Sequence, residues 1–207
     1  MRHYLNTTLK GKKDSRGLDH YSVYIMFSVQ RQTFKIKSRI FNKRITKDKF
    51  NRLNSSKNQY IAKDEKIIQD CIEASSLNGL LDIDQFKNLY TKKCTSIKSW
   101  LSNEIIQEQK RLNDDFFYGS EIDDDMDEPS VVKELEHLYG INKRTALHYL
   151  EHYSMNHNDS FDKYLLVHDW QSESLRDRFI LFLRNSGGIP DEHEKLVLFI
   201  DSLTLII

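Results

Sequence analysis

Between Phe34 and Ile40 the sequence alternates between two kinds of side chain, and this pattern constrains the fold more than any other feature. The even positions carry Phe, Ile, Ser and Ile, whereas the odd positions carry Lys35, Lys37 and Arg39. Because side chains of a β-strand alternate between two faces, the segment predicts a strand with one apolar and one cationic face. Like charges side by side are unfavourable, so we expect a negatively charged partner opposite the cationic face.

Two further strands are expected beside this one. Residues 4–9 favour a first strand, residues 21–29 alternate as a second strand with Met26 as the exception, and residues 33–41 form the third. A basic loop joins the first two strands, and a short "QRQ" turn joins the last two. The pattern predicts a three-stranded antiparallel meander, which needs an apolar cover on one face.

Helices are expected to follow the sheet. Residues 63–75 predict the covering helix, because Ile67, Ile68, Cys71 and Ile72 recur at one-face spacing. A second helix should begin at Asp82 or Asp84 as its cap, and a third spans about 95–112.

An acidic stretch separates these segments from the rest of the chain. The residues "NDDFFYGSEIDDDMDEPS" hold eight acids and no base, which is typical of a solvated linker. After it we expect helices over 130–138, 143–153, 161–167, 174–184 and 191–207.

The expected fold class is therefore α+β, a small three-stranded antiparallel sheet with a covering helix, followed by a mostly helical bundle. We expect three parts: residues 1–80 as a basic sheet-plus-helix domain, 81–128 as a helical connector with the acidic linker, and 129–207 as a helical domain.

Charge is unevenly distributed along the 207 residues, although the formal net charge is zero. Residues 1–66 contain 17 Lys and Arg against 5 Asp and Glu, a net charge of +12, and the remainder carries −12. Such asymmetry favours a nucleic-acid or acidic partner for the basic part. The alternative is an ordinary solvated face on which lysines block edge-to-edge strand pairing.

The candidate phosphate contacts fall into three groups of cations. They are Arg31, Lys35, Lys37 and Arg39 on the strand face, Lys43, Arg44 and Lys47 just beyond it, and Lys10, Lys12, Lys13 and Arg16 in the first loop. Lys and Arg on phosphates supply salt-dependent affinity, and a narrow β-ribbon can enter the major groove of double-stranded DNA.

Other chemistry has little support in the sequence. Neither a nucleophile motif nor a Gly-rich phosphate loop is present, so we expect no cofactor and a binding protein. The acidic run lacks the glycine and the closing glutamate of a calcium loop, and His148, His152 and His157 do not form an HExxH motif. We therefore expect no bound metal.

The compartment follows from similar reasoning. Two cysteines, Cys71 and Cys94, do not make a disulfide framework of the secreted kind. The N-terminus lacks the apolar core of a signal peptide, and the sequence has no apolar run long enough for a bilayer. We expect a cytoplasmic protein with no membrane partner.

The order of parts resembles the N-terminal portion of phage- and transposon-type tyrosine recombinases (integrases). The resemblance rests on "HYSVYIMFSVQRQTFKIKSRIFNKRITKDKF", on "KDEKIIQDCIEAS" and "DIDQFKNLYTKK", and on the later "NKRTALHYLEHYSMNHNDSFDKYLLVHDWQSESLRDRFILFLRNSGG". It implies an arm-binding sheet and a SAM-like core-binding bundle, in which Lys143, Arg144 and His148 contact the DNA backbone. The family's HxxR box is missing, so the catalytic domain would lie outside this chain.

The sequence therefore predicts the non-catalytic DNA-binding portion of a site-specific recombinase. The alternative is an interaction adaptor, viral or regulatory, whose helical region 161–207 docks a partner, and the C-terminal helix could also mediate self-association. A third hypothesis is autoinhibition, with the acidic linker folding over the basic sheet in the absence of DNA.

Overall fold

A computed structural model describes residues 1–8, 11–41, 43–55, 59–77, 80–118, 131–156, 165–172 and 174–207, with the backbone alone at 54–55, 112–118 and 174. The contacts between Cα atoms divide the chain into two compact units, Met1–Cys94 and Thr95–Ile207. We call these the sheet unit and the helical unit and describe each by itself.

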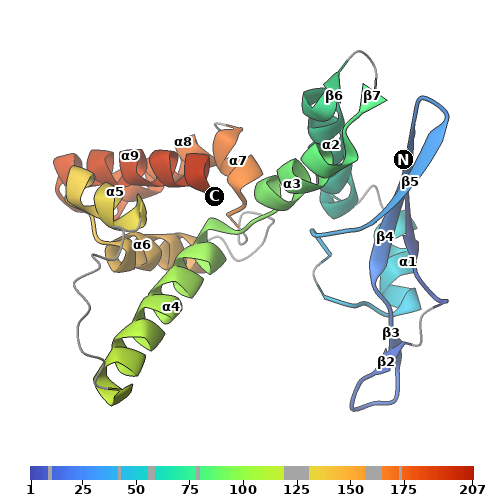
Figure 1. Cartoon of the computed structure of the whole chain (residues 1–207), viewed down its shortest axis with the longest axis horizontal. Helices are drawn as coiled ribbons and strands as arrows, with labels where there is room; N and C mark the ends of the chain where they lie inside the picture. The colour runs from blue at the N-terminus through green and yellow to red at the C-terminus, as the bar shows by residue number, and fades with distance from the viewer. Residues whose placement is uncertain are drawn as a thin grey trace. The chain divides into compact units, whose positions relative to one another are not determined.

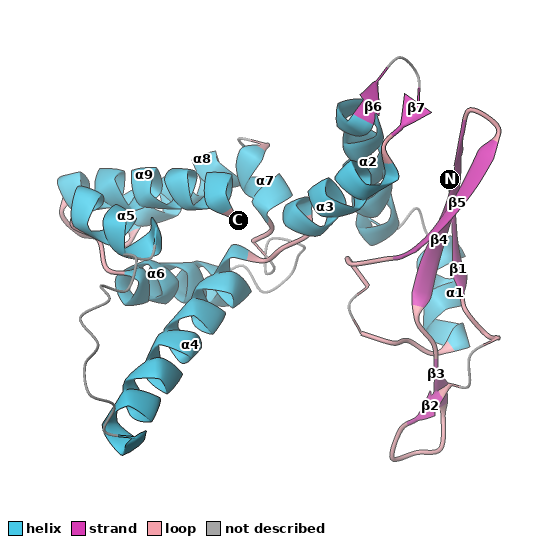
Figure 2. Ribbon diagram, in the orientation of Figure 1, coloured by secondary structure: helices cyan, strands magenta, loops and turns pink. Residues whose placement is uncertain are grey.

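The sheet unit is built on three antiparallel strands in the order β1-β4-β5, namely Arg2–Leu5, Val23–Val29 and Gln32–Lys37 (Figures 1 and 2). The predicted α+β class with a three-stranded antiparallel sheet is confirmed. The first strand ends earlier than expected, at Leu5. Within the loop after it, β2 (Lys12–Lys13) and β3 (Asp19–His20) pair as a small hairpin that the sequence pattern did not predict.

A tight turn joins β4 to β5 and fixes their register. Gln30 and Arg31 both have positive φ, 49° and 67°, and Val29 pairs with Gln32 across the turn. Two central residues with positive φ match the right-handed twist of a hairpin, although side chains other than Gly and Asn rarely adopt this conformation. The resulting register places Lys35 opposite Met26 and Lys37 opposite Tyr24.

Three helices accompany the inner face of the sheet: α1 (Lys47–Ser55), α2 (Gln59–Ser75) and α3 (Ile83–Lys93). The helix α1 was not predicted, and it buries Phe50 with Val23 in one apolar cluster. Phe27 of β4 packs on Phe86 of α3, with ring centroids 5.2 Å apart. The small sheet thus gains the apolar cover that it needs for stability.

A buried carboxylate, Asp64 of α2, connects these elements. Its Oδ1 accepts a hydrogen bond from the Tyr90 hydroxyl at 2.7 Å, and its Oδ2 accepts from the Ser38 hydroxyl and lies 3.3 Å from His3 Nε2. Burial and the nearby Asp64 raise the pKa of Tyr90 far above its ordinary value, so Tyr90 stays protonated and donates. One side chain therefore holds β1, the end of β5, α2 and α3 together.

Replacing Asp64 should destabilise the sheet unit far more than replacing an exposed acid of the same helix. Asp64→Ala leaves the buried hydroxyls of Ser38 and Tyr90 without their acceptor, so we expect a loss of about 3 kcal/mol in unfolding free energy. Glu73→Ala, at an exposed position of α2, should change it by less than about 0.5 kcal/mol. Urea unfolding followed by circular dichroism measures both, and similar values for the two variants would contradict the role of Asp64.

The boundary between the units lies inside the connector expected over 81–128. Asp82 caps α3, accepting from the backbone N–H groups of Asp84 and Gln85 at 3.0 Å, and α3 packs on α2 in the sheet unit. The short β6–β7 hairpin (Ser76–Leu77 and Leu80–Leu81) precedes it. The next helix, α4 (Ile97–Tyr118), belongs to the helical unit, and residues 119–130 of the acidic stretch lie outside the described residues.

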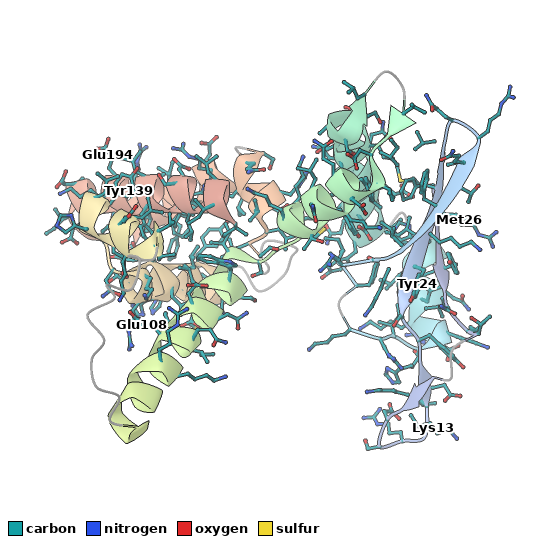
Figure 3. All side chains as sticks on the ribbon, viewed as in Figure 1. Lys13, Tyr24, Met26, Glu108, Tyr139 and Glu194 are labelled. Carbon is teal, nitrogen blue, oxygen red and sulfur yellow. The ribbon has the colours of Figure 1, made fainter. Side chains whose placement is uncertain are left out.

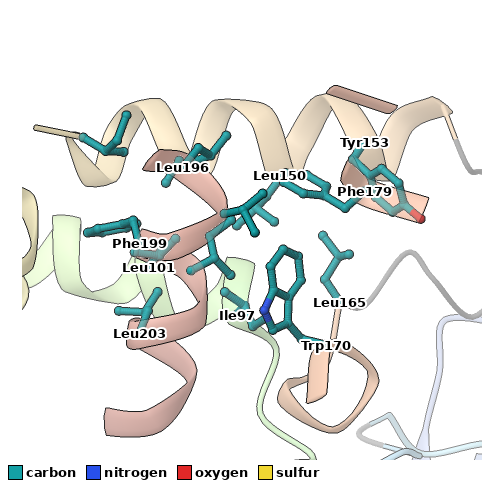
Figure 4. Close-up of a cluster of buried hydrophobic side chains, with 14 of the residues drawn as sticks. Ile97, Leu101, Leu150, Tyr153, Leu165, Trp170, Phe179, Leu196, Phe199 and Leu203 are labelled. Carbon is teal, nitrogen blue, oxygen red and sulfur yellow. The ribbon is translucent and has the colours of Figure 1, made fainter. Parts of the chain in front are cut away.

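The described part of the helical unit contains α4 together with α5 (Val131–Tyr139), α6 (Lys143–Asn156), α7 (Val167–Gln171), α8 (Ser174–Asn185) and α9 (Pro190–Ile206). Its core gathers large aromatic and aliphatic side chains (Figure 4), with Trp170 and Tyr153 each stacking edge-on against Phe179. Of the helix expected over 161–167, residues 161–164 lie outside the described residues, and α7 begins only at Val167.

Candidate nucleic-acid interface

The face of the sheet opposite the helices carries the predicted cationic strand face. We call it the outer face and define it by the alternate residues that point away from the core. These are Arg2 and Tyr4 of β1, Tyr24, Met26 and Ser28 of β4, and Thr33, Lys35 and Lys37 of β5.

The register arranges the outer face in rows across the strands. Arg2, Met26 and Lys35 form one row. Tyr4, Tyr24 and Lys37 form the next, with the two tyrosine rings 6.0 Å apart between centroids. Cations therefore occupy the edge strands, while the central strand carries an aromatic ring, a thioether and a hydroxyl; Figure 3 labels Tyr24 and Met26 on this strand.

Among the described residues, no acidic side chain forms an ion pair with Lys35 or Lys37 on this face. None of the residues in β1, β4 and β5 is Asp or Glu. Lys35 and Lys37 are exposed, and neither forms an ion pair with another described residue. The whole sheet unit holds 20 Lys and Arg against 9 Asp and Glu, a net charge of +11. An unneutralised cluster of cations on a flat face is the electrostatic signature of a polyanion site.

The Asp64 network also fixes the residue that follows the strand. Ser38 turns inward to Asp64, and the backbone N–H of Arg39 donates to the Tyr90 hydroxyl at 3.0 Å. The Arg39 side chain is exposed, one alternation beyond Lys37. The buried network thus sets where the cationic row ends.

Arg31 lies apart from the other cations of the strand. It occupies the turn at the opposite end of β5 from Lys37, and six residues at about 3.3 Å each separate the two by roughly 20 Å. The structure therefore keeps Lys35 and Lys37 together on β5, places Arg39 in the bend after the strand and leaves Arg31 at the hairpin tip.

The basic loop is ordered around Asp14. Its carboxylate accepts from the backbone N–H groups of Arg16 at 2.9 Å and Leu18 at 3.0 Å, and it lies 3.1 Å from His20 Nε2. The hydrogen bond from Leu18 lowers the pKa of Asp14 most, and His20 lowers it further. Exposed Lys12 and Lys13 are presented on this hairpin, where Figure 3 labels Lys13.

A second contact joins this hairpin to the remaining predicted cations. His20 Nδ1 lies 3.3 Å from the backbone oxygen of Arg44, and Tyr21 bridges Ile45 through two backbone hydrogen bonds of 2.9 Å. Lys43 and Arg44 are exposed. The two basic segments are therefore neighbours in space, although about 30 residues apart in sequence.

Removing the Asp14 carboxylate should loosen this hairpin. In Asp14→Ala the amide protons of Arg16 and Leu18 lose their acceptor, so we expect their hydrogen exchange to accelerate at least about tenfold at neutral pH. In the wild type, whose Asp14 pKa is lowered on folding, the protection of these two amides relative to their intrinsic exchange rates should decrease as the pH falls below the ordinary value of 3.8. Asp48→Ala, an exposed acid at the start of α1, is the control with the same charge change. Unchanged exchange at Leu18 in Asp14→Ala would contradict the assignment.

Lys143 and Arg144, expected to contact the DNA backbone, differ sharply in the structure. Lys143 is buried, and its Nζ lies 3.0 Å from Glu108 and 3.9 Å from Glu136. This ion pair lowers the pKa of Glu108. Arg144 is exposed. Lys143 therefore holds α4, α5 and α6 together and has no free charge for a phosphate, which leaves Arg144 as the accessible member of the pair.

Replacing Lys143 should cost stability and not nucleic-acid affinity. Lys143→Ala leaves Glu108 and Glu136 without their cation, and we expect a loss of about 2 kcal/mol at pH 7. A carboxylate with a lowered pKa stabilises above its ordinary 4.5 and loses that contribution in acid, so the difference from wild type should shrink as the pH falls below 4.5. Arg144→Ala should stay within about 0.5 kcal/mol. Equal effects of both substitutions in chemical unfolding would contradict the buried role.

The residues weighed as metal ligands or nucleophiles do not assemble a site in the described chain. His148 and His152 are exposed, with ring centroids 4.5 Å apart, and no group of three His, Cys, Asp or Glu that could hold a metal occurs among the described residues. His157 and Asp123, Asp125 and Asp127 of the acidic run lie outside them. Burial raises the pKa of Cys71 to about 11 and that of Cys94 further, so neither thiol ionises at neutral pH.

Six residues of the outer face were not among the predicted contacts: Arg2, Tyr4, Tyr24, Met26, Ser28 and Thr33. Tyr24 and Met26 occupy the alternate positions of residues 21–29 that the pattern assigned to the solvent side, and Met26 stood out as its exception. The alternation of residues 21–29 therefore indicated which side chains of this strand lie on the outer face. The pairing of Arg2 with Met26 could not be predicted from the sequence, because register depends on contacts between strands.

Comparisons of the chain with protein-family models, with curated protein sequences and with solved structures gave no significant match. A search of the described residues found no helix with the length and apolar character required to cross a membrane.

Proposed function

We propose that the sheet unit binds double-stranded DNA through its outer face. The observation that carries this proposal is the arrangement of unneutralised cations on both edge strands, on either side of an uncharged central strand, in a unit of net charge +11. Both β1 and β5 are edge strands, so cations that only block edge pairing could lie on either of them, and the salt dependence of DNA binding distinguishes that explanation from a DNA-binding face.

The dimensions of the sheet fit a major groove. Neighbouring strands lie about 4.8 Å apart, so β1 and β5 are separated by about 10 Å, whereas the groove of B-DNA is about 12 Å wide. Arg2 on one edge and Lys35 and Lys37 on the other would then reach toward the two phosphate walls. Tyr24, Met26 and Ser28 on the central strand would face the base edges, where a hydroxyl can hydrogen-bond and an apolar group can contact a thymine methyl.

The basic hairpin supplies contacts beyond the sheet. Lys12, Lys13, Lys43 and Arg44 are exposed and held near one another through His20 and Tyr21. They would meet phosphates flanking the bound segment, which fixes orientation without reading sequence. Arg31, at the other end of β5, would contact the backbone on the opposite side.

The role of this DNA-binding activity is proposed from the order of the parts. A basic sheet followed by a helical unit resembles the non-catalytic N-terminal portion of a tyrosine recombinase, in which strand exchange is carried out by a separate catalytic domain. Exposed Arg144 and His148 on α6 are the candidates for a second backbone contact.

Charge reversal on the outer face tests the proposal. Fluorescence anisotropy with a labelled duplex of about 20 base pairs, between about 50 and 200 mM salt, gives the affinity and its salt slope. Lys35→Glu/Lys37→Glu should weaken binding at least about tenfold at the lower salt and reduce the slope of log K against log salt by about two.

The matched control reverses two exposed lysines on the helices of the same unit, Lys66→Glu on α2 and Lys87→Glu on α3. It changes the net charge by the same amount, but it should lower the affinity much less because neither side chain belongs to the outer face. Equal losses from the two double variants would show that binding depends on total charge alone. Wild-type affinity in Lys35→Glu/Lys37→Glu would refute the interface.

A further inference from the structure

A cavity of about 560 Å³ lies between α8 and α9 of the helical unit. This volume is within the range of sites for small molecules. Apolar side chains form most of its wall, and three charged side chains and one imidazole also line it. The lining includes Ile180, Leu183, Arg184, His193, Glu194 and Val197.

The register of the two helices places polar side chains at both ends of the groove between them. Arg176 of α8 forms a bidentate ion pair with Asp201 of α9, with its Nη2 2.7 Å from the carboxylate. Because α8 and α9 follow one another through a short loop and run antiparallel, each step back along α9 corresponds to a step forward along α8. Arg184 therefore lies opposite His193 and Glu194, about 12 Å along the groove from Arg176.

Two opposite charges at this end have no partner in the described chain. Arg184 and Glu194 are both exposed, and neither forms an ion pair with the other or with another described residue; Figure 3 labels Glu194 on the surface of α9. Arg176, by contrast, has its charge balanced by Asp201. The groove thus combines one neutralised end with one end that presents a free cation and a free anion.

His193 adds a buried polar atom at the same end. The residue is 8% exposed, and its Nε2 lacks a hydrogen-bond partner among the described residues. The ring fits there because position 188 is glycine, where a Cβ would come within 2.6 Å of Nε2. The ring packs against Gly188 beside Arg184 and Glu194, and it is these two exposed charges that would meet the polar groups of a ligand at this end.

The middle of the groove is apolar. Leu183 and Val197 are buried at its floor, whereas Ile180 is half-buried and Leu198 is 42% exposed. An apolar body seated here would cover surface that is now open to water.

We propose that this groove binds a small zwitterion with an apolar side chain, in chemical class an α-amino acid such as leucine. The carboxylate pairs with Arg184, next to His193, and the ammonium pairs with Glu194. The side chain lies against Leu183, Val197 and Leu198. The inference concerns the helical unit alone and does not depend on the proposed DNA binding.

Titration of the full chain with L-leucine tests the site, with nitrogen-15 chemical shifts as the readout of both affinity and location. We expect saturable shifts at α8 and α9 with a dissociation constant on the order of 1 mM, as suits a ligand of this size. Two analogues test the two charged groups of leucine separately: 4-methylpentanoate lacks the ammonium, and isopentylamine lacks the carboxylate. Each should bind at least about tenfold more weakly than leucine.

Substitutions then assign each charge. Arg184→Gln should weaken leucine about tenfold without changing isopentylamine, and Glu194→Gln should weaken leucine without weakening 4-methylpentanoate. Both positions are exposed, so folding is preserved. Glu192→Gln on α9 and Arg144→Gln on α6 are exposed controls outside the groove lining and should leave leucine binding unchanged. Absence of saturable shifts in α8 and α9, equal binding of leucine and 4-methylpentanoate, or equal losses in the controls would each overturn the proposal.

Discussion

The sheet unit depends on one buried carboxylate. Asp64 accepts hydrogen bonds from Tyr90 and Ser38 and lies against His3, so a single side chain connects the first strand, the end of the last strand and two helices. Such a network is favourable only when its members are satisfied together, which fixes their relative positions. Because Arg39 N–H donates to Tyr90, the same network determines where the exposed cationic row ends. The buried hydrogen bonds of Asp64 therefore also fix the backbone at the end of the exposed cationic strand.

The alternation from Phe34 to Lys37 was sufficient to predict the strand, its two faces and the α+β class, because alternation is a local property. The predicted end of the strand at residue 41 was wrong, since β5 ends at Lys37 and Arg39 lies in the bend after it. The cap at Asp82 was also within reach, because a carboxylate before an amphipathic segment is a local signal. The helix α1 was missed: its sequence, "KDKFNRLNS", is mostly polar, and its few apolar side chains find their partners in distant Val23 and Phe41.

The candidate site was predictable only in part for the same reason. Lys35 and Lys37 follow from alternation, whereas the rows that join them to Tyr24, Met26 and Arg2 follow from strand register. Lys143 is a case in which the sequence predicted an exposed contact that the structure shows to be buried. A lysine beside an arginine at a helix start is typical of an exposed basic pair, and only the tertiary contacts with Glu108 and Glu136 reveal that its charge is already balanced inside the helical unit.

The formal charge of zero does not weaken the case for a polyanion partner, because a ligand responds to local and not to total charge. At physiological ionic strength the field of an exposed charge decays over about 8 Å, so a phosphate near the outer face is influenced mainly by side chains on that face. Those side chains include Arg2, Lys35 and Lys37 and no carboxylate from the three strands. The acids that balance the total lie mostly in residues 95–207, which carry −11. Segregating the two signs into separate units preserves a cationic surface within a neutral chain, and mixing them on one surface would not.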